Sequence, residues 1–200
     1  MGITNEEFQV ERDQTQTCQL VPMPNSVLNT DQPNPTDYLS DIERFASFMR
    51  FLKPAQPSAT VPGGATSIAN GKAVFASVGC SLCHTPQLTT NTSTVAALSN
   101  QPANLYSDLA LHNMGPGLAD GITQGEAGGA DFRTAPLWGL GQRLFFLHDG
   151  RTSSLITAIF DHSSGSAQAG NASEANGVVN NFANQSARNQ QDLLNFLRSL

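Results

Sequence analysis

The sequence contains few charged residues, few cysteines and no long hydrophobic run. Charged residues make up 13% of its 200 residues, and 16 acidic residues outnumber 10 basic ones. The resulting net charge of −6 argues against a nucleic-acid-binding surface, which needs clustered lysine and arginine. No apolar run approaches the roughly 18 residues that a membrane span needs. We therefore expect neither a nucleic-acid partner nor a membrane span. The length of 200 residues suits one compact domain with extended loops.

Two of the three cysteines stand in a motif with a specific chemical meaning. Cys80, Cys83 and His84 form the pattern C-x-x-C-H, the attachment sequence of a c-type haem. Thiols three positions apart can both reach the porphyrin vinyl groups, and the histidine that follows can give an imidazole nitrogen to the iron. We expect a covalent haem c, with Cys80 and Cys83 as thioether anchors and His84 as the proximal iron ligand.

Other uses of a C-x-x-C pair are disfavoured by what the sequence lacks. A zinc site of paired cysteines needs a second pair, and the remaining cysteine, Cys18, stands alone. A thioredoxin-like redox pair needs a βαβ context, and no β pattern surrounds the motif.

Hydrophobic periodicity predicts helices on both sides of the motif. Their expected extents are residues 36–52, 67–78, 155–162 (capped by Thr152 or Ser153) and 186–200 (capped by Ser186). Residues 86–135 lack periodicity, and we expect them to be loops that wrap the haem.

These patterns predict an all-α, cytochrome c-like haem domain with long irregular loops. It would occupy residues 66–200, with its last helix crossing the helix that precedes the motif. Residues 1–65 are expected to be an irregular segment with one helix and a Pro/Gly linker, the remnant of an upstream domain.

The other axial position of the iron has four candidate ligands. They are His112, Met114, His148 and His162. Met114 lies in a loop after the motif, as a methionine ligand commonly does in small cytochromes c. His162 ends an amphipathic helix whose apolar side could direct it toward the haem. Spacing alone does not choose between these candidates.

Several further segments form an ordered set along the chain. They are residues 1–5, 79–86, 106–109, 111–121, 132–139, 146–150 and 195–200. Together they resemble the C-terminal half of the di-haem oxidoreductases often labelled thiol oxidoreductase-like, relatives of bacterial di-haem cytochrome c peroxidases.

The resemblance implies a choice of distal ligand. In the peroxidase relatives, the electron-transfer haem takes this ligand from a helix, fourteen positions after the histidine of an aromatic-x-His-Asp-Gly segment. Counted from His148, that position is His162, where the peroxidases have methionine. The resemblance thus implies a bis-His iron held by His84 and His162. His148 would then lie near the haem edge, and Met114 is the runner-up ligand.

Three further expectations concern the surroundings of the haem. Trp138 is expected to pack on the porphyrin. Arg151, with Arg133 and Arg143, is a candidate partner of the haem propionates. A calcium site between the haem domains, as some di-haem peroxidases have, would use the acidic residues of the glycine-rich region, which are Asp120, Glu126 and Asp131.

The sequence departs from the family pattern at several points. It holds one C-x-x-C-H motif where the family has two haems, so it resembles a haem domain separated from its partner. Cys18, which family members often pair, has no partner cysteine. The family's His-Gly-Gly pattern is replaced by His162 followed by Ser163, Ser164 and Gly165.

Covalent haem attachment takes place outside the cytoplasmic membrane of bacteria, so we expect a periplasmic or extracellular location. Residues 1–6 have neither the basic nor the apolar region of a signal peptide. We therefore expect the chain to be a mature piece or a fragment of a longer protein.

One-electron transfer is the favoured function, because a bis-His iron has no vacant position for a substrate. The alternative is a peroxidase-like haem enzyme with an open or labile distal site, although the relatives carry out that chemistry on the other haem domain. A gas sensor is a third class without distinct support. The expected partner is a redox protein or a second haem domain.

Overall fold

The computed structural model describes residues 41–60, 62–165 and 171–200. The chain divides into two units between Pro54 and Ala55. The first contains α1 (Asp41–Arg50), which lies within the helix predicted for residues 36–52. The second, Ala55–Leu200, carries the haem motif, and the boundary expected near residue 65 stays a prediction. No described helix is both long and apolar enough to cross a membrane.

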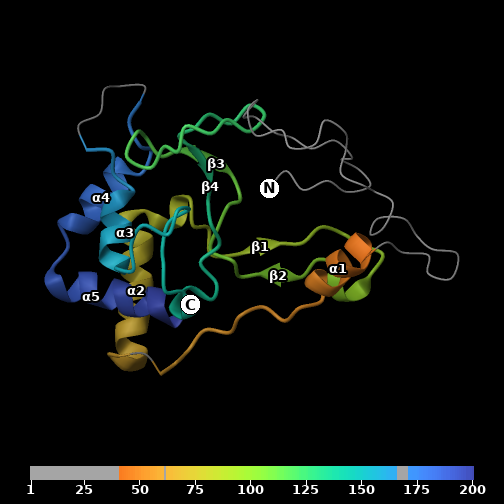
Figure 1. Cartoon of the computed structure of the whole chain (residues 1–200). Coiled ribbons are helices and arrows are strands. Elements are labelled where there is room, and N and C mark those ends of the chain that lie inside the picture. Colours follow the sequence, from red (N-terminus) through yellow and green to blue (C-terminus); the bar gives the residue numbers. More distant parts are fainter. Residues whose placement is uncertain (1–40, 61, 166–170) are drawn as a thin grey trace, which may run out of the picture. The chain divides into compact units, whose positions relative to one another are not determined.

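Two helices far apart in the sequence form the core of the second unit. α2 (Gly64–Val78) and α5 (Ala187–Ser199) cross each other, as expected (Figure 1). At the crossing, the rings of Phe75 and Phe196 meet edge to face with centroids 5.4 Å apart, and Tyr106 packs against both. Edge-to-face contact is a favourable geometry for aromatic pairs. The remaining buried core residues are Val74, Val78, Leu140, Leu155, Phe182, Leu193, Leu194, Leu197 and Leu200.

The close approach of the two helices depends on a glycine. A Cβ atom at Gly71 would lie 2.0 Å from the carbonyl oxygen of Asp192, so any side chain there would force the helices apart. Beside this contact, the buried Asp192 carboxylate accepts hydrogen bonds from Ser67 Oγ (2.5 Å) and Asn70 Nδ2 (2.6 Å). The crossing therefore combines backbone contact with a buried charge whose hydrogen bonds are satisfied.

The other helices pack beside this pair. α3 (Leu155–Asp161) begins at Ser154, whose Oγ accepts from the amide of Thr157, so the expectation of Thr152 or Ser153 as the cap is wrong. α4 (Asn176–Ala183) is a helix that the periodicity did not predict. Ser186 caps α5 as expected, since its Oγ accepts from the amide of Asn189.

The prediction of an all-α fold is wrong. The described residues have 39% helix and 9% strand, and they form two small antiparallel sheets inside the region expected to be loops. β1 (Leu88–Thr89) pairs with β2 (Pro102–Ala103), and β3 (Leu111–Asn113) pairs with β4 (Asp131–Arg133). Strands of two or three residues are too short to show the alternation that reveals a strand in a sequence. The unit is thus mixed, with a helical core and short strands in its loops.

Short 3₁₀ turns complete the second unit. They are η1 (Cys80–Leu82), η2 (Ala96–Leu98) and η3 (Leu140–Gln142). The first holds the haem motif, and the last packs against α5.

We predict that Gly71→Ala lowers the free energy of unfolding by about 1–3 kcal/mol, because the added methyl group overpacks the α2–α5 crossing. Chemical denaturation measures this change. The matched control is Gly177→Ala in α4, where an added Cβ meets nothing within 4 Å. That variant should be neutral or slightly stabilising, since alanine favours a helix more than glycine does. Equal unfolding curves for the two variants would contradict the role given to Gly71.

Candidate functional site

The haem motif begins directly where α2 ends. Gly79 stops the helix with a left-handed backbone (φ 103°), and η1 then winds Cys80 to Leu82 into a single tight turn. The amide of His84 donates to the carbonyl of Cys80 (2.9 Å), so the three motif residues share one turn. Cys80 and Cys83 are both half-buried and are not joined in a disulfide. The geometry presents both sulfurs and the imidazole from one short piece of chain.

Burial controls the protonation of the two thiols. It raises the pKa of Cys80 to about 12. It also raises the pKa of Cys83, and the negative charges of Asp108 and Glu174 add to this effect. Both residues are therefore thiols at neutral pH. Reactive redox cysteines have lowered pKa values, so this pair does not have the environment of a thioredoxin-like site.

His84 is held by a backbone carbonyl. Its Nδ1 lies 3.0 Å from the carbonyl oxygen of Tyr106, which can only accept, so Nδ1 carries the proton and Nε2 carries a lone pair. Burial lowers the pKa of His84 to about 4, which leaves the imidazole neutral at pH 7. Hydrogen bonds from the amides of Ser107 and Asp108 to Thr85 and Cys83 (both 2.9 Å) keep this carbonyl beside the motif.

His162 is held in the same way at the end of α3. Its Nδ1 donates to the carbonyl of Ala158 (2.6 Å), so Nε2 again carries the lone pair. Burial lowers the pKa of His162 as well. A charge on His162 would lower the pKa of His84 further, so the two imidazoles lie within electrostatic reach of each other. The structure thus presents two neutral imidazoles, each with a lone pair on Nε2, from segments 78 positions apart (162 minus 84).

His112 is held quite differently, because both of its ring nitrogens are occupied. Nε2 lies 2.8 Å from Asp108 Oδ2, and Nδ1 lies 2.8 Å from Glu174 Oε2. These hydrogen bonds raise the pKa of His112, with the Glu174 contact the largest cause. When both nitrogens donate to carboxylates, neither has a lone pair for a metal. This arrangement removes His112 from the candidate iron ligands.

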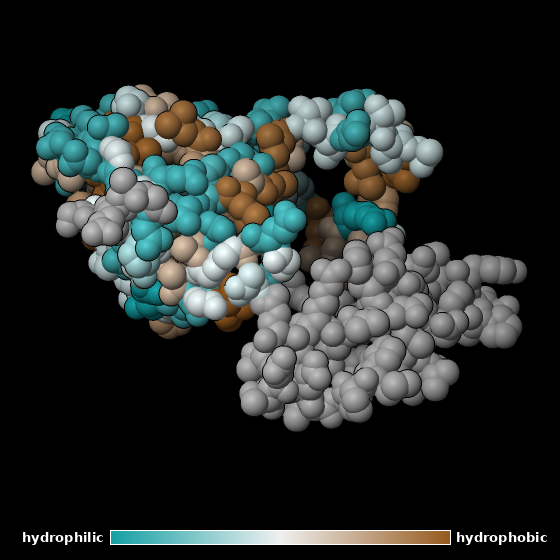
Figure 2. Space-filling model, turned by 90° about the horizontal axis from the view of Figure 1, so that it is seen from above, coloured by the Kyte–Doolittle hydropathy of each residue, from teal (hydrophilic) through white to brown (hydrophobic). Residues whose placement is uncertain are grey.

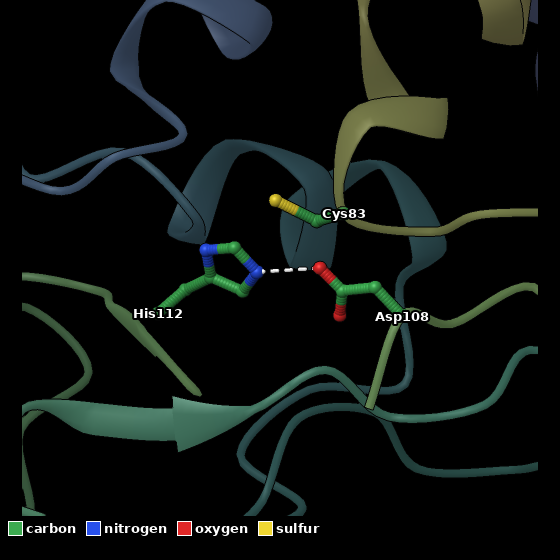
Figure 3. Close-up of side chains that lie close together, drawn as sticks. All are labelled: Cys83, Asp108 and His112. Carbon is green, nitrogen blue, oxygen red and sulfur yellow. Dashed lines mark hydrogen bonds and ion pairs between the residues drawn. The ribbon is translucent and has the colours of Figure 1, made fainter. Parts of the chain in front are cut away.

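Cys83, Asp108 and His112 lie together, with one potential ligand atom of each within 4.8 Å of the others (Figure 3). Among the described residues, no other three His, Cys, Asp or Glu side chains come this close together. Asp120, Glu126 and Asp131 do not form such a group, and a calcium site between haem domains stays a prediction. Asp131 uses its two oxygens to accept from Asn113 Nδ2 and the amide of Gly128, which closes the loop locally.

The remaining predicted site residues have defined places in the second unit. Met114 is half-buried after β3, where its amide donates to the carbonyl of Ala130 (2.8 Å). His148 is exposed and stacks on Phe132, with ring centroids 4.3 Å apart. Trp138 and Tyr106 line a cavity of about 210 Å³. The Tyr106 carbonyl is the group that accepts the hydrogen bond from His84.

Arg151 forms an ion pair with Asp149 (2.7 Å) and donates to the carbonyl of Gly117 (2.8 Å). It thereby ties the His148 segment to the loop that follows Met114. Contacts of Trp138 or Arg151 with a porphyrin stay predictions.

Sequence reasoning missed the groups that orient the site. Tyr106 and Ala158 act through backbone carbonyls, which no residue pattern reveals. Glu174 stands in a segment without periodicity and reaches His112 across 62 positions. The segment of Tyr106 to Leu109 belongs to the ordered motifs of the sequence, and that was the one available signal.

A comparison with protein families now adds to this geometry. A family model described as "Di-haem oxidoreductase, putative peroxidase" matches residues 40–200. The chain belongs to this di-haem oxidoreductase family. Membership confirms the resemblance read from the motifs and makes haem iron the cofactor of this oxidoreductase domain. No curated protein and no solved structure matches the chain.

We predict that His112 titrates above its ordinary pKa of about 6.5, and that Glu174→Gln lowers this value by removing its main cause. Because the folded-state pKa is raised, the contact stabilises the fold fully below about pH 6.5. That stabilisation is lost as the pH rises through the pKa of His112. NMR titration of the imidazole Cε1–H resonance measures the shift. Asp149→Asn, which removes a carboxylate bonded to Arg151, should leave the His112 titration unchanged. An unshifted His112 in the wild type would contradict the bridging contacts.

Proposed function

We propose that this chain is a c-type cytochrome domain that transfers single electrons, with its haem iron held by His84 and His162. The proposal is supported mainly by the fact that the two imidazoles have the same tautomer and the same kind of hydrogen-bond partner. Each donates Nδ1–H to a backbone carbonyl, each has a pKa lowered by burial, and each keeps the Nε2 lone pair free. Metal-binding histidines in proteins typically have this outer hydrogen bond, which fixes the ring and its tautomer.

The other residues fit a covalently bound haem. The thiols of Cys80 and Cys83 are free and protonated at neutral pH, the state in which a thiol can add to a porphyrin vinyl group. Leu82, between them, is 75% exposed, and Phe160 in α3, two positions before His162, is 42% exposed. The surface of the described chain shows hydrophobic areas of this kind among hydrophilic ones (Figure 2). A porphyrin packed between the two segments would cover such apolar side chains.

When bound, the haem supplies reversible one-electron Fe(III)/Fe(II) chemistry. The chain would hold the iron through the neutral imidazoles of His84 and His162, which would leave no position for peroxide. Two imidazoles, rather than imidazole and thioether, should also keep the reduction potential low. Electron transfer is favoured over peroxidase-like chemistry for this reason, and a labile His162 is the arrangement on which the peroxidase alternative depends.

The family is di-haem, whereas this sequence has one C-x-x-C-H motif. We propose that a second haem domain or a separate redox protein exchanges electrons with this one. Covalent attachment implies maturation outside the cytoplasmic membrane, so we propose a periplasmic or extracellular location. Cys18 lies outside the described residues.

We predict a low-spin spectrum for the haem-loaded protein in both oxidation states, without the near-infrared band of methionine–iron ligation, and with a haem that acidic solvent does not extract. Carbon monoxide and peroxide should leave the wild-type spectrum unchanged. His162→Ala should open the iron, giving a high-spin ferric signal and rapid carbon monoxide binding to the ferrous form.

The matched control is Met114→Leu, which conserves volume at the runner-up ligand and should retain the wild-type spectrum. A methionine band that disappears in Met114→Leu would overturn the assignment of His162. A high-spin wild-type protein that reacts with peroxide would instead favour the peroxidase alternative.

A further inference from the structure

Residues 106–108 hold His84 in place. The Tyr106 carbonyl accepts a hydrogen bond from the His84 imidazole, and the amides of Ser107 and Asp108 donate to the carbonyls of Thr85 and Cys83. Ser107 is fully buried, and its Oγ donates to the carbonyl of Thr134 (2.7 Å). The position of Asp108 is thus fixed relative to the proximal histidine.

The segment that holds His162 is fixed from the other side. Ser173, which is 4% exposed, donates from Oγ to the carbonyl of His162 (2.5 Å). Asn176, at the start of α4, accepts through Oδ1 from Ser163 Oγ (2.8 Å) and from the amide of Ser164 (2.9 Å). The two serines that replace the glycines of the family pattern therefore tie the turn after His162 to the region of Ser173 and Asn176.

His112 joins these two segments. One ring nitrogen bonds to Asp108, two residues after the Tyr106 carbonyl, and the other bonds to Glu174, the neighbour of Ser173. Glu174 is also bound to β3, since its Oε1 accepts from the Asn113 amide and its own amide donates to the Asn113 carbonyl (both 2.9 Å). A continuous path of hydrogen bonds and short chain links thus runs from His84 to His162 through an imidazole that holds no metal itself.

We propose that His112 is a positioning residue that fixes the separation of the two iron-ligating segments and so keeps the distal position closed. The inference deepens the proposed function and rests on it. Asp108 and Glu174 are the two carboxylates it uses, and the contacts are charge-assisted, which makes them stronger than neutral hydrogen bonds. Loss of the bridge would leave the Ser173 segment attached to β3 through Asn113 but no longer bonded to Asp108. Its position relative to the haem motif would then be less fixed, and His162 would leave the iron more often.

The imidazole makes both contacts of the bridge, whereas Glu174 makes one of them. The Glu174 side chain is also 53% exposed, so solvent screens its contact. A variant that removes the imidazole should therefore have a larger effect than one that neutralises Glu174 alone.

The test compares haem-loaded wild type, His112→Asn and Glu174→Gln. Carbon monoxide binding to the ferrous protein reports how often His162 dissociates, and EPR of the ferric protein reports the high-spin fraction. We expect carbon monoxide binding to be about tenfold faster in His112→Asn, as loss of a charge-assisted contact implies, with a smaller increase in Glu174→Gln. The high-spin fraction should rise in the same order.

The matched control is Asp192→Asn, which weakens another buried carboxylate network, at the α2–α5 crossing. It should lower stability without accelerating carbon monoxide binding, so a general loosening of the fold is distinguished from loss of positioning. Glu174→Gln keeps the test informative if His112→Asn does not fold, because Glu174 is largely exposed.

The outcomes separate the two proposals. If wild type resists carbon monoxide and both bridge variants resist it equally, the positioning role is overturned and bis-His electron transfer stands. If the wild type binds carbon monoxide as rapidly as His162→Ala, bis-His ligation fails and the positioning role fails with it. Faster binding in Asp192→Asn than in His112→Asn would also overturn the positioning role.

Discussion

The hydrogen bond from an imidazole Nδ1 to a backbone carbonyl is the interaction on which the whole site depends. It occurs twice, from His84 to Tyr106 and from His162 to Ala158. Each bond selects the tautomer with a free Nε2 and sets the ring plane. Because backbone carbonyls are the acceptors, the ring orientations are only as precise as the main-chain positions around them. The loop around Tyr106 therefore orients a candidate iron ligand, although its sequence shows no regular pattern.

The helical core fixes the positions of those loops. The crossing of α2 and α5 at Gly71 fixes the direction in which α2 delivers the chain to Gly79 and the haem motif. The same crossing places Phe75 against Tyr106, so the residue whose carbonyl orients His84 is itself packed on the core. On the other side, Phe160 of α3 contacts Phe182 of α4, and this contact links the helix that carries His162 to the core. Core packing and ligand geometry are thus joined through aromatic contacts.

The sequence predicted the parts of this structure that have a strong local signal. The C-x-x-C-H pattern, the periodic helices α2 and α5, and the Ser186 cap are all local features, and the family match agrees with the motif set. The strands were missed because two or three residues show no alternation. The Ser154 cap was missed because serine and threonine occur in succession before α3, and only the hydrogen bond distinguishes them. Asp120 and Asp131 accept hydrogen bonds from the amides of Ile122 and Gly128, local contacts that the sequence pattern did not predict. The bridge at His112 depends on contacts across 62 positions, which one sequence cannot display.

The central claim is that two imidazoles, and no thioether, hold the iron of this domain. X-ray absorption at the iron edge of the haem-loaded protein tests it most directly, because nitrogen and sulfur ligands scatter differently. The account predicts a first shell of nitrogen atoms alone in both oxidation states, from the porphyrin, His84 and His162. A sulfur atom in that shell would contradict it and assign the distal position to a methionine. A first shell lacking one axial atom would contradict it as well, and would make this domain a site for binding peroxide.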